Sequence, residues 1–375
     1  MTASATRTSD GDGAALVTWV ATRVAVAVLA FAVGWMVLDA TSGGVPSWLA
    51  SWDHWDAQLY EKVARFGYQG YPDHYPDKDV VAFFPGLPLA LRAVHIVVRN
   101  WVVAGLLISL VAGAFAAVAL ARLGALEAGR GVGQRAVLYL TLSPYAVFLA
   151  AGYSEALFLG FALWSWLFAK QRRWLAAGVL GGAAALVRVT GVFLGAALLT
   201  QWLLDRSGRR LRDLLPLSLP FVAIGGYVVY LHHLTGDWLA WPHAQADGWQ
   251  RRLTTPWHAF STTWDSATGS GLGSAYIWSF RGEVVAVLVG VLLSLALLVL
   301  RRWAELVYVG GQVVALATSS FYLSVARATL LWWPLWLLLA RYTADRRWAH
   351  AAYLSVAPPL MAAAVVAFVQ GHWVG

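Results

Sequence analysis

The stretch "WVVAGLLISLVAGAFAAVALA" (residues 101–121) contains no charged side chain, and Ser109 carries its only hydroxyl group. Apolar runs of this kind, near the length that crosses a bilayer, recur through a chain of 375 residues that is 59% hydrophobic and 12% charged. A soluble domain of this length cannot cover so much apolar surface with so little charge. Because lipid cannot satisfy backbone groups, and no alternating barrel strands are visible, the sequence predicts an all-α polytopic membrane protein.

The basic residues predict how the apolar segments are oriented. The net charge of +8 would suggest a nucleic-acid partner in a soluble protein, but here it collects in short loops between apolar segments. Cytoplasmic loops of membrane proteins carry such an excess of Lys and Arg, so we expect no nucleic acid as a partner. The basic loops expected inside are 122–135, 170–173, 205–213, 301–302 and 341–347.

These loops all lie inside if the N-terminus is cytoplasmic, about 11 segments cross the membrane, and residues 80–98 form a re-entrant or interfacial helix. The crossing segments are then 14–39, 101–121, 136–151, 156–169, 174–187, 189–204, 214–232, 284–300, 304–320, 328–341 and 350–371. A full crossing by residues 80–98 would invert the orientation of everything after it. We expect one integral membrane domain over residues 1–375, with a first outer loop (40–82) and a long outer loop (233–283) on the extracytoplasmic side.

Two arginines interrupt apolar sequence. Arg188 separates two short apolar pieces within 174–204, and broken helices that meet at a charge usually line a polar cavity. Its counter-charge is either a phosphate or an acidic side chain elsewhere in the bundle. Arg327, in "SVARATLLWWP", lies at an outer helix start, where it either pairs with a phosphate or extends to the interface.

Carboxylates gather in the outer loops. In "SWDHWDAQLYEKVARFGY" (51–68), Asp53 and Asp56 are three residues apart, a spacing that allows a general base at a cavity mouth. The alternatives are a helix cap with a first-turn acid, or a metal site that includes His54. In "GYSEA", Glu155 is either a functional group at the membrane edge or, with Ser154, a helix cap.

Four segments in fixed order resemble the PIG-V family, the GPI mannosyltransferase II-type enzymes of the GT-C superfamily. They are "WDAQLYEKVARFGY", "AFFPGLPLALR", "LSPYAVFLAAGYSEALF" and "WLAAGVLGGAAALVRVTG", and they cover residues 52–200 densely. Beyond residue 200 the resemblance thins to "SVARATLLWWPLWLLLA" (324–340).

The resemblance implies roles for particular residues. Trp55 and Asp56 stand at the family's Trp-Asp, and Ser154 and Glu155 stand at its Ser-Glu. Arg188 and Gly191 stand at an Arg-Ser-Asn-Gly-like stretch in which Val189 and Thr190 replace the middle pair. His54 replaces an arginine, and Ala328 stands where an aromatic residue is expected. Asp56 is then the general base. Asp53 matches no family position and is either a helper or only a cap. The chemistry also calls for cations at the phosphate, for which Arg188, Arg327 and either His54 or His74 are the candidates.

The resemblance also implies an activity. A GT-C-type helical bundle would move mannose from a polyprenyl- or dolichyl-phosphate carrier to a lipid-linked or glycan acceptor hydroxyl, with inversion, on the non-cytoplasmic face. A lipid phosphate is a good leaving group that needs no protonating acid, so no cofactor is required. Whether a divalent metal takes part is left open by the sequence. The protein would lie in the plasma membrane of a bacterium or in the ER membrane of a eukaryote, with its active site on the extracytoplasmic face. Broken helices also suit a transporter or flippase of a lipid-linked sugar, although no inverted repeat is visible.

Overall fold

The computed structural model describes residues 2–38, 48–69, 78–205, 209–270 and 273–375. Regular structure within these ranges is helical, apart from one isolated bridge between Leu253 and Ser319, which confirms the all-α prediction. The chain divides into two compact units, which we describe one at a time. The first comprises Met1–Ala57, Val98–Leu163 and Leu330–Val374, and the second comprises Gln58–Val97, Trp164–Thr329 and Gly375. His74, expected to supply a cation, lies outside the described residues.

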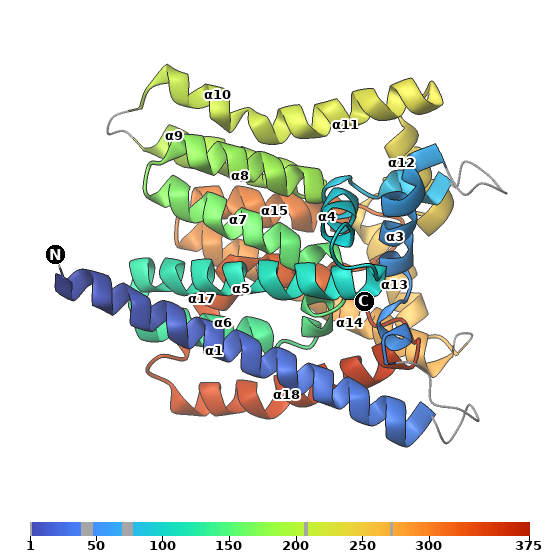
Figure 1. Ribbon diagram of the computed structural model, residues 1–375, viewed down its shortest axis with the longest axis horizontal. Coiled ribbons are helices and arrows are strands. Elements are labelled where there is room, and N and C mark those ends of the chain that lie inside the picture. Colours follow the sequence, from blue (N-terminus) through green and yellow to red (C-terminus); the bar gives the residue numbers. More distant parts are fainter. Residues whose placement is uncertain (1, 39–47, 70–77, 206–208, 271–272) are drawn as a thin grey trace. The chain divides into compact units, whose positions relative to one another are not determined.

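Five helices, of 10 to 32 residues, build most of the described part of the first unit. They are α1 (Thr2–Val33), α5 (Trp101–Ala128), α6 (Arg130–Thr141), α17 (Trp333–Tyr342) and α18 (Arg347–Val369), with a π-helical turn, η1 (Gly34–Leu38), after α1. α1 packs along α5, α6 and α18, and α6 packs against α5 and α17 (Figure 1). The indole Nε1 of Trp19 in α1 donates a 3.0 Å hydrogen bond to the carbonyl oxygen of Leu110 in α5, so this buried polar group is satisfied.

The apolar segment 136–151 is broken. α6 ends at Thr141, and a short 3₁₀ helix, η5 (Ala146–Leu149), precedes α7 (Ser154–Lys170). Pro144 lies in the break, where a proline disfavours helical backbone at the residue before it. Arg23 of α1 is 6% exposed and bonds to both sides of the break, from Nη1 to the Ala146 carbonyl (2.8 Å) and from Nη2 to the Thr141 carbonyl (2.9 Å). A lone arginine in an apolar span is the sequence signal for such a role.

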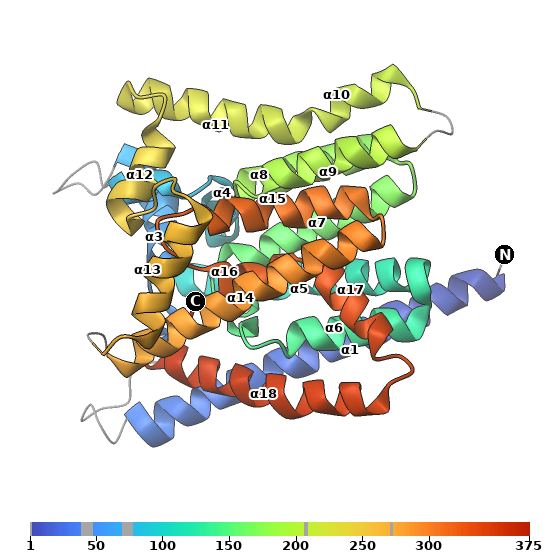
Figure 2. The same cartoon turned by 180° about the vertical axis from the view of Figure 1, so that it is seen from behind.

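Small residues let the helices of the second unit approach closely. α8 (Trp174–Val187) packs against α9 (Gly191–Leu204) and α11 (Leu219–Thr235), and α9 also packs against α15 (Trp303–Ala317). Figure 2 shows α15 beside α14 (Ser274–Val299), with which it packs. α8 is rich in Ala and Gly, the residues that permit close contact between apolar helices. Shorter helices of the chain include η3 (Gly67–Gln69), η4 (Lys78–Ala82), α4 (Gly86–His95), η6 (Leu211–Asp213), α10 (Leu214–Leu217), α16 (Val325–Ala328) and η7 (Thr329–Leu331).

The segment 233–283, expected as a long outer loop, contains regular helices. α12 (Ala240–Trp249) and α13 (Pro256–Thr268) lie within it, and α14 begins before it ends. Pro256 occupies the first turn of α13, where its missing N–H costs no hydrogen bond. The side of the membrane on which this segment lies stays a prediction.

Within the described residues, four helical segments are long and apolar enough to cross a membrane: Gly11–Met36, Trp101–Ala128, Tyr276–Val299 and Arg347–Val369. The pair Leu211–Leu217 and Leu219–Thr235, bent by 41°, adds a fifth if it is one span. α4 has 10 residues, about 15 Å of helix against a hydrocarbon core of about 30 Å, so it is too short to cross. The helices fit a multi-pass membrane protein, while 11 crossings and a single domain over residues 1–375 stay predictions.

Candidate active site

Asp56 is the first residue of α3 (Asp56–Phe66) and is 8% exposed. Trp55, directly before it, has a left-handed φ of 48°, which turns the chain into the helix. Asp53 caps the end of a preceding 3₁₀ helix, η2 (Ala50–Trp52), and is half-buried. The two aspartates therefore differ: Asp56 is a first-turn acid of α3, and Asp53 belongs to the turn before it.

The loop that carries Asp56 meets the Ser-Glu segment within the first unit. The hydroxyl of Tyr153 donates a 3.0 Å hydrogen bond to the carbonyl oxygen of His54. Ser154 and Glu155 follow Tyr153 directly, begin α7, and are both fully buried. The loop of Asp56 and the Ser154–Glu155 segment, which are far apart in the sequence, are thus joined by a direct hydrogen bond.

An aromatic cluster that the sequence did not single out packs on the same loop. The ring of Phe368, in the last turn of α18, lies 5.8 Å from the rings of both His54 and Trp55 and 5.9 Å from that of Tyr153. Trp373 meets Trp55 edge to face, with ring centroids 5.4 Å apart and planes at 88°. No motif identifies these partners, because aromatic residues near a chain's apolar helices are common for other reasons.

His54 lies in this cluster. Burial lowers the pKa of its imidazole, although the backbone carbonyl of Val369 and the charge of Asp53 act in the opposite direction. The ring is therefore mostly neutral at pH 7. Within the part of the chain that the structure describes, no three His, Asp or Glu side chains come together as a metal site, so His54 and the two aspartates form no such cluster.

Arg188 lies in the second unit, at the break between α8 and α9. Its backbone is extended (φ −149°, ψ 144°), as the expected broken helix requires. Two glycines allow close approach here: a Cβ on Gly86 would stand 2.8 Å from the Leu186 carbonyl oxygen, and one on Gly191 would stand 2.3 Å from the Ala185 Cα. The "FFPG" and "RVTG" segments therefore pack against the same end of α8.

Arg327 also belongs to the second unit and is 5% exposed, in α16. The residues just before Arg327 donate backbone hydrogen bonds to the carboxylate of Glu283, in α14. The first of these donors is the Ser324 N–H, at 2.6 Å. Sequence reasoning did not select Glu283. Its signal is an acidic residue at the start of the long apolar part of α14, which is a functional hypothesis by default.

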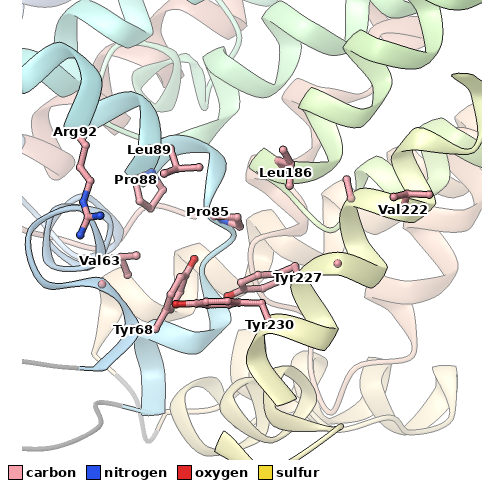
Figure 3. Close-up of a pocket in the computed structure, with 13 residues that line it drawn as sticks. Val63, Tyr68, Pro85, Pro88, Leu89, Arg92, Leu186, Val222, Tyr227 and Tyr230 are labelled. Atoms are coloured by element: carbon pink, nitrogen blue, oxygen red, sulfur yellow. The ribbon is translucent and has the colours of Figure 1, made fainter. Parts of the chain in front are cut away.

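A cavity of about 490 Å³ in the second unit is lined by residues of α4 and α11 (Figure 3). Leu89 of α4 and Val222 of α11 are apolar residues of its wall. The hydroxyls of Tyr68 and Tyr227 donate to the Phe83 carbonyl at 2.7 and 2.9 Å, so the polar ends of these tyrosines are satisfied by backbone. Leu186, two residues before Arg188, also lines it. Apart from Arg92 and three tyrosines, the lining of the cavity is apolar.

Comparison with known proteins tests the resemblance. The family model described as mannosyltransferase (PIG-V) matches residues 36–196. The resemblance to the PIG-V family is confirmed over this segment. It contains Asp53, Asp56, Glu155 and Arg188, while Arg327 lies beyond it.

Curated relatives agree. GPI alpha-1,6-mannosyltransferase 2 of Mus musculus is 38% identical over 168 residues, which cover 41% of this chain and 32% of the relative. The protein of the same name from Rattus norvegicus is 37% identical over 162 residues, 40% of this chain and 31% of the relative. The matched part thus spans about a third of these relatives. The oligosaccharyltransferase of Archaeoglobus fulgidus in the apo form aligns over 95% of this chain and 56% of its own, with 12% identity and a TM-score of 0.47.

Proposed function

We propose that the protein is a mannosyltransferase that takes mannose from a polyprenyl- or dolichyl-phosphate carrier and transfers it to a hydroxyl of a lipid-linked or glycan acceptor. The PIG-V match over residues 36–196 and the names of the curated relatives support a mannosyl transfer. The observation that carries the proposal is the Tyr153–His54 hydrogen bond, which joins the loop of Asp56 to the Ser154–Glu155 segment. Both segments lie in the matched part of the chain.

Asp56 is the general base of the proposed reaction. As the first residue of an 11-residue helix, its carboxylate lies where the helix dipole favours negative charge. It takes the proton of the acceptor hydroxyl as that oxygen attacks the sugar carbon. The bond from this carbon to the phosphate oxygen breaks, the phosphate leaves with the electron pair, and the configuration inverts.

The leaving phosphate needs cations rather than an acid. Arg188 and Arg327 are assigned this role, because charge-assisted bonds from guanidinium groups suit phosphate oxygens. The apolar tail of the carrier also needs a groove, and we assign it to the cavity lined by Leu89 and Val222. We further propose a GT-C-type bundle with its site on the non-cytoplasmic face, in the ER membrane of a eukaryote or the plasma membrane of a bacterium.

The test is direct. Purified protein in liposomes is incubated with radiolabelled polyprenyl-phosphate-mannose and a membrane lipid extract, and the labelled products are identified by mass spectrometry. We expect a new mannosylated product and loss of label from the carrier. Movement of intact carrier across the liposome membrane without any product would overturn the proposal in favour of a flippase.

A further inference from the structure

The backbone before Arg327 forms an anion-binding turn. Ser324 has a left-handed φ of 60°, and the helical turn of α16 begins at the next residue. Successive amides in such a turn converge and favour a negative charge. Here the N–H groups of Ser324, Val325 and Ala326 all donate to one carboxylate, that of Glu283.

Glu283 fills this turn from α14. Its Oε1 accepts from the Ser324 N–H at 2.6 Å, and its Oε2 accepts from those of Val325 (2.7 Å) and Ala326 (3.0 Å). The side chain is 1% exposed, so water does not compete for these charge-assisted bonds. The carboxylate therefore fixes the main chain immediately before Arg327.

The segment that precedes α14 reinforces this contact. Arg251, between α12 and α13, donates to the carbonyl oxygen of Leu323, and its positive charge acts on Glu283. In α13, the Thr263 Oγ1 accepts a hydrogen bond from the Tyr322 N–H at 2.8 Å. The residues just before Arg327 are thus held by three side chains, those of Arg251, Thr263 and Glu283.

We propose that Glu283 is a positioning residue for Arg327, and that Glu283, Arg251 and Thr263 together set the donor-phosphate contact through it. This inference rests on the proposed function, in which Arg327 neutralises the carrier phosphate. Displacements of about 1 Å at a binding group cost roughly a hundredfold in rate. A fixed backbone before a buried arginine is a means of avoiding that loss.

A double-mutant cycle tests the proposal. Glu283→Gln keeps one acceptor oxygen but places an NH₂ group against the other backbone donors. We expect donor kcat/KM to fall about tenfold or more, through a higher KM for the carrier and an unchanged KM for the acceptor. Because Glu283 acts through Arg327, adding Glu283→Gln to Arg327→Gln should cause no further loss. Multiplied losses in the double variant, or wild-type donor KM in Glu283→Gln, would overturn the proposal.

Two controls keep the result interpretable. Glu305→Gln changes another buried carboxylate of the second unit, one paired with Lys170 (3.1 Å) and Arg302 (2.8 Å), and should lower thermal stability without raising the donor KM. If Glu283→Gln does not fold, Arg251→Gln replaces it, with a smaller rise in donor KM and the same lack of additivity with Arg327→Gln.

Binding of sugar-free polyprenyl phosphate distinguishes a failure of the proposed function from a failure of the positioning role of Glu283. Absence of any mannosylated product from the wild type would contradict the proposed function alone. Equal weakening of polyprenyl phosphate binding by Glu283→Gln and Arg327→Gln would still support positioning. Wild-type binding by Glu283→Gln beside impaired binding by Arg327→Gln would contradict it.

Discussion

The hydroxyl of Tyr153 donates a 3.0 Å hydrogen bond to the carbonyl oxygen of His54, residues that are 99 positions apart in the chain. This bond fixes the start of α7 relative to the start of α3 within the first unit. Both segments are part of the match to the PIG-V family. The orientation of the Asp56 loop therefore depends on a side chain that has no chemical role of its own in the proposed reaction.

Tyr153→Phe removes this bond and leaves the ring. A typical buried hydrogen bond contributes about 1 kcal/mol, and the His54 carbonyl keeps its other bond, from the Ala57 N–H at 3.1 Å. We expect the free energy of unfolding to fall by about 1 kcal/mol and mannosyl transfer to slow, both of which can be measured on purified protein. Tyr342→Phe, at a tyrosine 48% exposed on α17, is the control and should change neither quantity.

Gly86 should not tolerate a side chain. A Cβ there would lie 2.7 Å from the Val187 Cγ2 and 2.8 Å from the Leu186 carbonyl oxygen, so the end of α8 beside Arg188 would have to move. We expect Gly86→Ala to destabilise the protein by about 1–3 kcal/mol in thermal unfolding. Gly225→Ala in α11, where a Cβ meets nothing within 4 Å, should be neutral or stabilising. Equal effects of the two substitutions would contradict the packing described for Gly86.

Protonation of His54 should destabilise the fold. Because burial lowers its pKa in the folded state, the unfolded chain binds more protons as the pH falls below about 6.5, the ordinary value for histidine. Stability should therefore decrease as the pH falls through 6.5 and below, and should be insensitive to this group above it. Thermal unfolding between pH 5 and pH 8 measures this. The fall should be smaller in His54→Gln, and an identical pH profile in the variant would show that His54 does not contribute.

If the cavity holds the apolar tail of the carrier, blocking it should affect long-chain donors more than short-chain ones. Ala223 lines it, so Ala223→Trp should block the apolar chain. We expect a higher KM for long-chain polyprenyl-phosphate-mannose and little change for a short-chain analogue. Val229→Trp places the same ring on α11 outside the lining, at a residue 43% exposed, and should affect neither donor. A loss that is the same for both donors would place the tail elsewhere.

Local signals in the sequence predicted much of the fold. Gly67, with a φ of +73°, ends α3 where the amphipathic pattern stops, and the charge of Arg188 marks the break between α8 and α9. The approximate extents of the apolar helices follow from their composition. The break after Thr141 was missed, because its stabilising partner, Arg23, lies in a different helix.

The candidate site was harder to predict for the same reason. Sequence spacing left Asp53 and Asp56 equivalent, and the family resemblance favoured Asp56. The structure makes Asp56 a first-turn acid of α3 and Asp53 a residue of the preceding turn. Phe368 packs on Trp55 in the first unit, and Glu283 accepts from Ala326 in the second. No local pattern in the sequence links the members of either pair, which accounts for the absence of Phe368 and Glu283 from the prediction.

The role of Asp56 is the central claim, and transfer by Asp56→Asn tests it most directly. The amide is nearly isosteric but cannot accept the acceptor's proton, so kcat should fall by roughly 10²–10⁴-fold, with folding and insertion intact. Asp53→Asn should lose less, and Glu61→Gln, which changes a carboxylate on the same helix paired with Arg65 at 2.9 Å, should lose little. Transfer of radiolabelled mannose by Asp56→Asn at the wild-type rate would contradict the assignment of Asp56 as the general base.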